Sequence, residues 1–347
     1  MDYWTRISKK LLFVASGTIV LLFIIKLFSF SSEQTTDDKT YYGKFRQHYS
    51  IYSVEIPKEL DFCGEPVPLE DLEVKRRLDK ELLVNTYFQS NTIVLMKRSN
   101  RWFPIIEPIL KRYNIPDDFK YLTVAESNLT NAVSPAGAVG YWQLMKATAK
   151  IYGLEISPEV DERYHMVKAA EAACKYLKRA YGEFGSWTLS AAAYNMGIDG
   201  IKRQIKKQKS NNYYDLYLNT ETSRYVFRIL AIKRLFTHPN EYGFHLREKD
   251  KYEIVPSHTL TVDTSIANLV DFAFSQNINY KILKTFNPWL RKNKLTNTNR
   301  KSYTIEIPDS GYRVFLNIGL DPLHLGDSLT ESQLDGLSTD SIKDSIR

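Results

Sequence analysis

The chain has 347 residues, 43% of them hydrophobic, which is enough for one large domain or two. Its formal net charge of +7 would suit an anionic partner, but no helix-turn-helix, zinc-finger or RNP pattern accompanies that charge. We therefore expect no nucleic acid partner, and the charge fits either attraction to an anionic envelope or a surplus without a role. The six histidines show no metal-ligand spacing, so we expect no metal and no cofactor.

The N-terminus carries an apolar run, residues 11–25, that follows three basic residues. This order places the N-terminus inside by the positive-inside rule. The run is shorter than the roughly 20 residues of a spanning helix, but Lys26 at the interface would lengthen it. We expect residues 1–30 to be an uncleaved signal anchor, with a cleaved signal peptide as the alternative. Residues 31–40 then form a polar linker, and the rest of the chain is exported.

Residues 41–99 are expected to form a helical lead-in, with an amphipathic helix around residues 69–87 that braces the domain after it. That domain opens at residues 101–104. Pro104 fits the start of a helix there, and Pro108 predicts a kink in the same segment.

The two cysteines, Cys63 and Cys174, lie far apart in the sequence. Export permits a disulfide, but no feature of the sequence brings them together, so their pairing stays open. Cys174 belongs to a helix predicted over residues 167–181. Its stripe of small and apolar residues predicts a buried face, and it consists of Val167, Ala170, Cys174 and Leu177.

Glu126 occupies one position of an otherwise apolar stripe. The stripe is Ile115, Phe119, Leu122, Glu126 and Leu129, and its steps alternate between four and three residues. On a helix this spacing puts all five side chains on one face. Burial disfavours a charged carboxyl, so Glu126 should keep its proton to unusually high pH and suit general acid catalysis of glycosidic cleavage. The same position also suits a carboxylate at the rim of a core, or one paired with a Lys or Arg.

The helix that carries Glu126 is expected to start near Pro116, with Asp117 and Asp118 at the positive end of its dipole. Glu126 then lies near the C-terminal end of the helix. Ser127 follows and can hydrogen-bond the carboxyl or cap the backbone.

Residues 134–140 form a turn-rich loop that can pass close to a ligand. A second helical segment is predicted over residues 141–152, with Gly153 after its end. A third is predicted over residues 187–198, capped by Ser186.

Three short motifs occur in the order that is typical of family 1 lytic transglycosylases: Ala125-Glu126-Ser127, Gly140-Tyr141-Trp142-Gln143-Leu144-Met145, and Ala193-Tyr194-Asn195. The aromatic pair before Gln143 is similar to the membrane-bound type D branch, and it replaces the leucine-methionine order of soluble relatives. The resemblance covers about residues 100–245 and includes residues 221–226, which resemble the closing helix of the family. It implies a mostly α, lysozyme-like helical catalytic domain that cleaves the bond between N-acetylmuramic acid and N-acetylglucosamine in peptidoglycan.

The resemblance also implies roles for individual residues. Glu126 matches the catalytic acid, which protonates the glycosidic oxygen and then acts as a base. The other matched positions are expected to orient that carboxyl or to bind the sugars, and they are Ser127, Tyr141, Gln143, Met145, Tyr194 and Asn195.

A second carboxylate is absent from the sequence between Ser127 and Leu154. Ordinary glycosidases use two carboxyl groups, so a single acid fits a reaction in which the substrate supplies its own nucleophile. The resemblance implies that this nucleophile is the 6-hydroxyl of muramic acid, which attacks C1 and gives a 1,6-anhydro end. Glu155, Asp161 or Glu162 could still fold back into the cleft. A hydrolytic muramidase similar to goose-type lysozyme is therefore the alternative enzyme, and a non-catalytic wall-binding scaffold is the alternative outside enzymes.

Residues 250–310 predict a small β-α-α-β domain that is similar to a LysM glycan-binding module, with a structural appendage as the alternative. The tail over residues 326–347 is rich in Ser and Asp and is expected to be disordered. Together these features predict a protein of the bacterial cell envelope, anchored in the inner membrane with its catalytic domain in the periplasm. Peptidoglycan glycan strands are the expected partner, whereas protein partners and the exo or endo mode stay open.

Overall fold

The computed structural model describes Gly43 and residues 51–309. The expected signal anchor or signal peptide at 1–30, the linker at 31–40 and the tail at 326–347 lie outside the described residues. No helix of the described part has the length and apolar character to cross a membrane. The chain divides into two units, residues 1–53 and 54–347, and everything below concerns the second.

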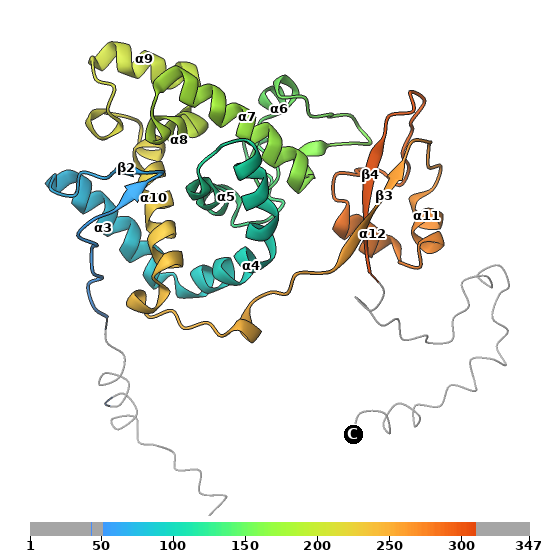
Figure 1. Ribbon diagram of the computed structural model, residues 1–347, viewed down its shortest axis with the longest axis horizontal. Helices are drawn as coiled ribbons and strands as arrows, with labels where there is room; N and C mark the ends of the chain where they lie inside the picture. Colours follow the sequence, from blue (N-terminus) through green and yellow to red (C-terminus); the bar gives the residue numbers. More distant parts are fainter. Residues whose placement is uncertain (1–42, 44–50, 310–347) are drawn as a thin grey trace, which may run out of the picture. The chain divides into compact units, whose positions relative to one another are not determined.

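The described part is mostly helical, as the sequence predicts (Figure 1). A short ribbon of β1 (Asp61–Phe62) and β2 (Glu65–Pro66) comes first. The helices up to residue 237 are α3 (Leu72–Tyr87), α4 (Gln89–Arg112), α5 (Lys120–Ser127), α6 (Lys146–Ile151), α7 (Met166–Phe184), α8 (Trp187–Met196), α9 (Ile198–Gln208) and α10 (Thr220–Thr237). Short 3-10 helices lie between these helices at Asp117–Phe119, Glu162–Tyr164 and Tyr213–Asp215, and after α10 at Pro239–Tyr242 and Glu248–Asp250.

Helix α3 is the amphipathic helix that the sequence predicts, and it braces α10. It starts after Asp71, whose carboxylate accepts the N–H groups of Glu73 and Val74 and so satisfies two free donors of the first turn. Its inner face packs along α10 (Figure 1), where Glu81 is buried and forms a 2.6 Å ion pair with Arg224. Because α10 also packs against α5, this contact supports the helix that carries Glu126.

The expected helix start at Pro104 is wrong. Helix α4 begins at Gln89 and continues through both Pro104 and Pro108. Each proline removes one backbone hydrogen bond, but α4 packs against α5 and α7 and buries Ile106 between the two prolines and Ile109 directly after the second. The packing of this face outweighs the local cost, since tertiary contacts supply most of the stability of a helix in a protein.

Helix α7 forms where the sequence predicts it and buries Ala170, Cys174 and Leu177. Val167 departs from the predicted buried stripe: it lies in the first turn of α7 and is 36% exposed. Cys63 and Cys174 are both free, so the structure holds no disulfide between them.

The second predicted helical segment, residues 141–152, is helical only from Lys146 to Ile151. Gln143 has a φ of 46°, in the left-handed region that interrupts a right-handed helix, and the Val139 N–H bonds the Leu144 carbonyl. Residues 141–145 therefore belong to the loop that precedes α6. The third predicted segment forms as α8 after its Ser186 cap, but it ends at Met196 because Gly197 breaks the helix with a φ of 86°.

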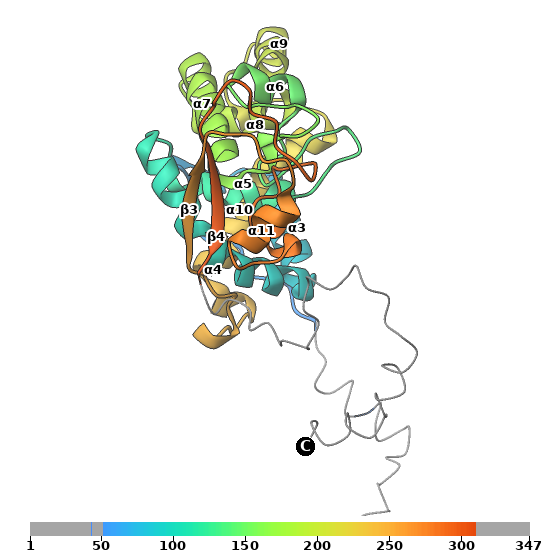
Figure 2. The ribbon, with the colours of Figure 1, turned by 90° about the vertical axis from the view of Figure 1, so that its right-hand side faces the viewer.

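The small C-terminal domain has the predicted β-α-α-β order. It consists of β3 (Ser257–Val262), α11 (Leu269–Ser275), α12 (Tyr280–Phe286) and β4 (Tyr303–Pro308). The two strands pair antiparallel from Ser257 opposite Pro308 to Val262 opposite Tyr303, and they lie side by side in Figure 2. Side chains from both helices and from β4 form the core beneath them.

The C-terminal domain is fixed to the helical part by residues 155–163, which we call the docking loop. Val160 is 1% exposed and belongs to the core of the C-terminal domain. The Asp161 N–H donates to the Trp289 carbonyl at 2.9 Å, and the Arg291 N–H donates to the Glu159 carbonyl at 2.7 Å. A buried apolar side chain and paired backbone groups thus make this a packed interface.

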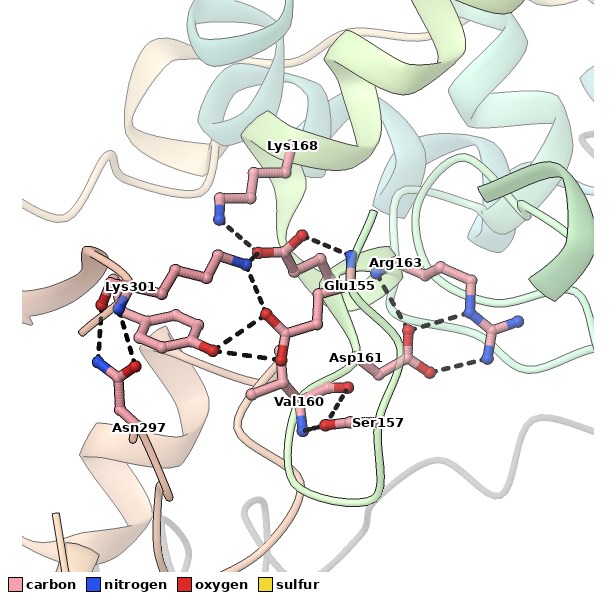
Figure 3. Close-up of polar contacts among 10 residues, drawn as sticks. Glu155, Ser157, Val160, Asp161, Arg163, Lys168, Asn297 and Lys301 are labelled. Atoms are coloured by element: carbon pink, nitrogen blue, oxygen red, sulfur yellow. Dashed lines mark hydrogen bonds and ion pairs between the residues drawn. The ribbon is translucent and has the colours of Figure 1, made fainter. Parts of the chain in front are cut away.

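Ion pairs surround the docking loop (Figure 3). The Lys301 ammonium lies 2.5 Å from the Glu155 carboxylate and 3.2 Å from that of Glu162. The Tyr303 hydroxyl also donates to Glu155, and Lys168 of α7 pairs with Glu162. These contacts join residues of both parts of the chain in one network.

Candidate active site

Glu126 lies in the last turn of α5, between core residues. Leu122 and Leu129 of the same stripe are 0% and 2% exposed, whereas Glu126 itself is half-buried. Burial raises the pKa of its carboxyl from 4.5 to about 7, and the negative charge of Glu221 acts in the same direction. The hydrogen bond from Tyr225 and the positive charge of Arg228 lower the pKa and offset part of this effect. The carboxyl can therefore both give and take a proton near neutral pH.

Tyr225 of α10 donates its hydroxyl to the Glu126 carboxyl. The Tyr225 ring is 1% exposed, and the Arg228 guanidinium carbon lies 5.6 Å from its centroid. Tyr225 is not among the site residues that the three sequence motifs predict. A signal was available, because Glu221, Tyr225 and Arg228 follow one another by steps of four and three and so share one face of α10.

The third motif lies at the end of α8, beside Glu126. Burial raises the pKa of the Tyr194 phenol well above its usual value, and the negative charge of Glu126 adds to the rise, which places the two groups within electrostatic reach. The Tyr194 hydroxyl donates to the Trp142 carbonyl at 2.7 Å and thereby joins the second motif to the third. Asn195 bonds both Glu221 and Thr222 at the start of α10.

Ser127 and Gln143 bond backbone carbonyls. The Ser127 hydroxyl donates to the Tyr141 carbonyl at 2.8 Å and to that of Thr123 at 3.1 Å. The Gln143 amide donates to the Gly140 carbonyl at 2.7 Å and to the Ala132 carbonyl at 3.0 Å. Ser127 thus holds the loop of the second motif against α5, whereas Gln143 joins that loop to Ala132, in the segment after α5.

Tyr141 and Met145 differ in exposure. Tyr141 is buried, and its ring lies 4.7 Å from that of Trp102. Met145 is 45% exposed at the start of α6, so of these residues it is the one most open to a ligand.

Gly140 allows the loop of the second motif to approach residues 162–164. It has a φ of 84°, and a Cβ at this position would lie 2.1 Å from the Arg163 carbonyl oxygen. The Arg163 guanidinium forms two bonds with Asp161 and donates to the Gly137 and Leu144 carbonyls at 3.1 and 3.3 Å. The second motif is thus fixed on one side by Ser127 and on the other by Arg163.

The distant carboxylates named in the sequence analysis are engaged elsewhere. Glu155 and Glu162 pair with Lys301, and Asp161 pairs with Arg163. Glu221 is the carboxylate whose charge reaches Glu126. Among the described residues, no group of three or more His, Cys, Asp or Glu side chains is placed to hold a metal ion.

A carboxylic acid with a raised pKa at a helix end, held by a tyrosine of a closing helix, indicates a lysozyme-like glycan-cleaving domain. The comparisons agree with this class. Residues 103–217 match the transglycosylase SLT domain, and residues 258–311 match the soluble lytic transglycosylase C-terminal LysM-like domain. The chain therefore carries both domains, as the sequence motifs indicate, and its mostly helical, lysozyme-like fold class is confirmed.

Among curated proteins, the chain is homologous to the membrane-bound lytic murein transglycosylase D of Escherichia coli (strain K12). The two are 28% identical over 243 residues, which are 67% of this chain and 52% of the relative. It is also 29% identical over 129 residues to a putative tributyltin chloride resistance protein of Alteromonas sp. (strain M-1), covering 36% of this chain and 62% of the relative. The chain thus spans about half the length of the murein transglycosylase that it matches.

Proposed function

We propose that this chain is a peptidoglycan lytic transglycosylase in which Glu126 is both the acid and the base. The observation that carries the proposal is the hydrogen bond from Tyr225 to the half-buried Glu126 carboxyl, whose pKa burial raises to about 7. The SLT domain and the murein transglycosylase homologue support peptidoglycan as the substrate. The bond cleaved would be that between N-acetylmuramic acid and N-acetylglucosamine.

The reaction follows from a single acid. Protonated Glu126 gives its proton to the glycosidic oxygen, and the bond from that oxygen to C1 breaks. The resulting Glu126 carboxylate accepts the proton of the muramic acid 6-hydroxyl while the 6-oxygen bonds C1, so a 1,6-anhydro end forms and no water is consumed. Well-oriented intramolecular reactions gain of order 7 kcal/mol or more, which reduces the need for a second carboxylate.

Under this proposal the six other motif residues bind or position the sugar. Tyr194 and Asn195 would act from the end of α8, where Tyr194 bonds the second motif and Asn195 bonds α10. Ser127, Tyr141 and Gln143 would act through the loop of the second motif. Met145 offers an exposed side chain at the edge of that loop.

The proposed location is the bacterial cell envelope. The name of the murein transglycosylase relative includes the words membrane-bound, which agrees with an anchor at residues 1–30. The SLT domain would then act from the periplasm, with the anchor in the inner membrane.

Digestion of purified peptidoglycan sacculi separates an enzyme from a wall-binding scaffold. We expect the full chain to release soluble glycan fragments from the sacculi, measured by chromatography of the supernatant. A Glu70→Gln variant, which changes an exposed carboxyl outside the site, should release them at the wild-type rate. Binding of the chain to pelleted sacculi without any release would contradict catalysis and favour the scaffold.

A further inference from the structure

A pocket of about 430 Å³ lies where the helical part meets the C-terminal domain. We call it the junction pocket. Trp102 and Tyr141 line it from the helical part, and Phe286 and Trp289 line it from the C-terminal domain. Its volume is typical of a ligand site, and the proposed reaction leaves its C-terminal wall without a role.

The docking loop holds the two walls of the junction pocket together. Val160 is packed in the core of the C-terminal domain, and the backbone bond from Asp161 reaches the carbonyl of Trp289, which is itself a lining residue. The ion pairs of Lys301 with Glu155 and Glu162 add to this contact (Figure 3). The junction pocket is therefore preformed, and binding of a ligand would cost little entropy for ordering its walls.

Four charged side chains line the pocket. Lys168 pairs with Glu162 and Glu171 pairs with Arg112, which leaves Arg101 on one wall and Glu306 on the other. The Arg101 guanidinium carbon lies 5.0 Å from the Trp102 ring centroid and 5.9 Å from that of Phe286. Glu306 of β4 accepts a 2.7 Å hydrogen bond from Ser257. Within residues 51–309 neither Arg101 nor Glu306 forms an ion pair. Both charges are thus available to a ligand that carries a carboxylate and an ammonium group.

An unused hydrogen-bond acceptor also lines the pocket. Among the described residues, the buried Asn131 Oδ1 atom has no hydrogen-bond partner, which is costly unless a donor reaches it. An amide N–H of a ligand would supply that donor.

The junction pocket is connected to the candidate active site through Tyr141. The Tyr141 ring lines the pocket, and its carbonyl accepts the hydroxyl of Ser127, the residue after Glu126. A ligand in the pocket would thus lie beside the loop of the second motif. Such a ligand can belong to the same glycan strand as the bond to be cleaved.

We propose that the junction pocket binds the peptide stem of peptidoglycan. A stem carboxylate would pair with Arg101, a stem ammonium group with Glu306, and a peptide N–H with Asn131 Oδ1. The apolar walls would contact the methyl and methylene groups of the stem. This proposal rests on the proposed function, because it takes the stem to be part of the substrate.

Calorimetric titration of the full chain with an isolated stem tetrapeptide, free of sugar and bearing both charges, tests the pocket without catalysis. We expect saturable binding by the wild type and at least a tenfold weaker Kd for Arg101→Gln and for Glu306→Gln. Arg76→Gln and Glu70→Gln, which change exposed groups outside the pocket, should bind as the wild type does. Absence of wild-type binding, or wild-type affinity in both pocket variants, would overturn the proposal.

Cleavage assays on two substrates separate the stem from the sugar. With Arg101→Gln we expect KM to rise at least tenfold on stem-bearing strands and to stay unchanged on strands stripped of their stems. An equal rise on both would overturn the assignment, because Arg101 would then act on the glycan. If the wild type cleaved neither substrate, the proposed function would be wrong. The calorimetry would still show whether the junction pocket binds the stem peptide.

Discussion

Replacing Glu126 with Gln should lower the rate of glycan release from sacculi by about a hundredfold or more, because an amide cannot deliver the proton that general acid catalysis requires. The fold should remain intact, since the amide oxygen can still accept the Tyr225 hydroxyl that now bonds the carboxyl. Rates of release at pH 6 to 8, together with thermal unfolding of the same preparations, measure both effects.

The pH dependence of stability gives this variant a second signature. The folded-state pKa of Glu126 is raised from 4.5 to about 7, so across that window the folded protein binds more protons than the unfolded chain does. Ionisation of Glu126 therefore costs the wild type stability as pH rises through the window. Glu126→Gln carries no such proton, so its thermal midpoint should rise relative to the wild type between pH 5 and pH 8.

Glu81→Gln is the matched control for Glu126→Gln. Glu81 is also a carboxyl of the helical part, but it is buried in an ion pair with Arg224 and does not reach the candidate site. This variant should lose thermal stability and keep its turnover. Digestion of sacculi by Glu126→Gln at the wild-type rate would show that another group is the acid.

Removal of the Tyr225 hydroxyl in Tyr225→Phe should shift the alkaline limb of the pH–rate profile to higher pH. The hydrogen bond from Tyr225 favours the charged form of Glu126 and lowers its pKa, so its loss raises that pKa above about 7. A hydrogen bond to a charged group is worth roughly 1.5–3 kcal/mol, so the shift should be on the order of one pH unit. The rate at neutral pH should also fall, because the carboxyl loses a contact that positions it.

Tyr213→Phe is the control for Tyr225→Phe. Tyr213 is likewise buried, and its hydroxyl donates to the Thr222 and Ser223 carbonyls of α10, both at 2.9 Å, without contacting Glu126. It should lower thermal stability and leave the alkaline limb in place. An alkaline limb of Tyr225→Phe that coincides with that of the wild type would mean that Tyr225 does not set the pKa of the acid.

The position of Glu126 could be predicted because its signal is local. The stripe with steps of four and three predicts one face of one helix, but α5 spans only Lys120–Ser127 and Leu129 follows it with a φ of 54°. Leu122 and Leu129 nevertheless lie in the core, before and after the carboxyl in the sequence, as the pattern predicts. The order of the β-α-α-β domain could also be predicted, because it too is read from short local segments of the sequence. By contrast, the sequence predicts a helix start at Pro104, whereas α4 starts at Gln89. No side chain caps that first turn, so the sequence carries no local signal for it.

The features that the sequence did not predict depend on distant residues. Gln143 takes up a left-handed backbone in a loop that Arg163 and Ser127 hold from outside, so a local helical pattern over residues 141–145 was misleading. Tyr225 reaches Glu126 across 99 positions of the sequence. Glu155 and Glu162 of the docking loop have no sequence pattern that distinguishes them from surface carboxylates. Only the fold shows that both pair with Lys301.

Mass spectrometry of the products released by the wild type tests the single-acid mechanism most directly. Attack by the 6-hydroxyl gives 1,6-anhydromuramic ends, one water lighter than hydrolysis products, without a reducing terminus and without label when digestion proceeds in ¹⁸O-water. A reaction with Glu126 as its only acid and base predicts this outcome at every cleaved bond. Reducing muramic ends that carry one ¹⁸O atom would contradict it and would indicate that a second carboxylate, with Glu221 the nearest in electrostatic reach, activates water.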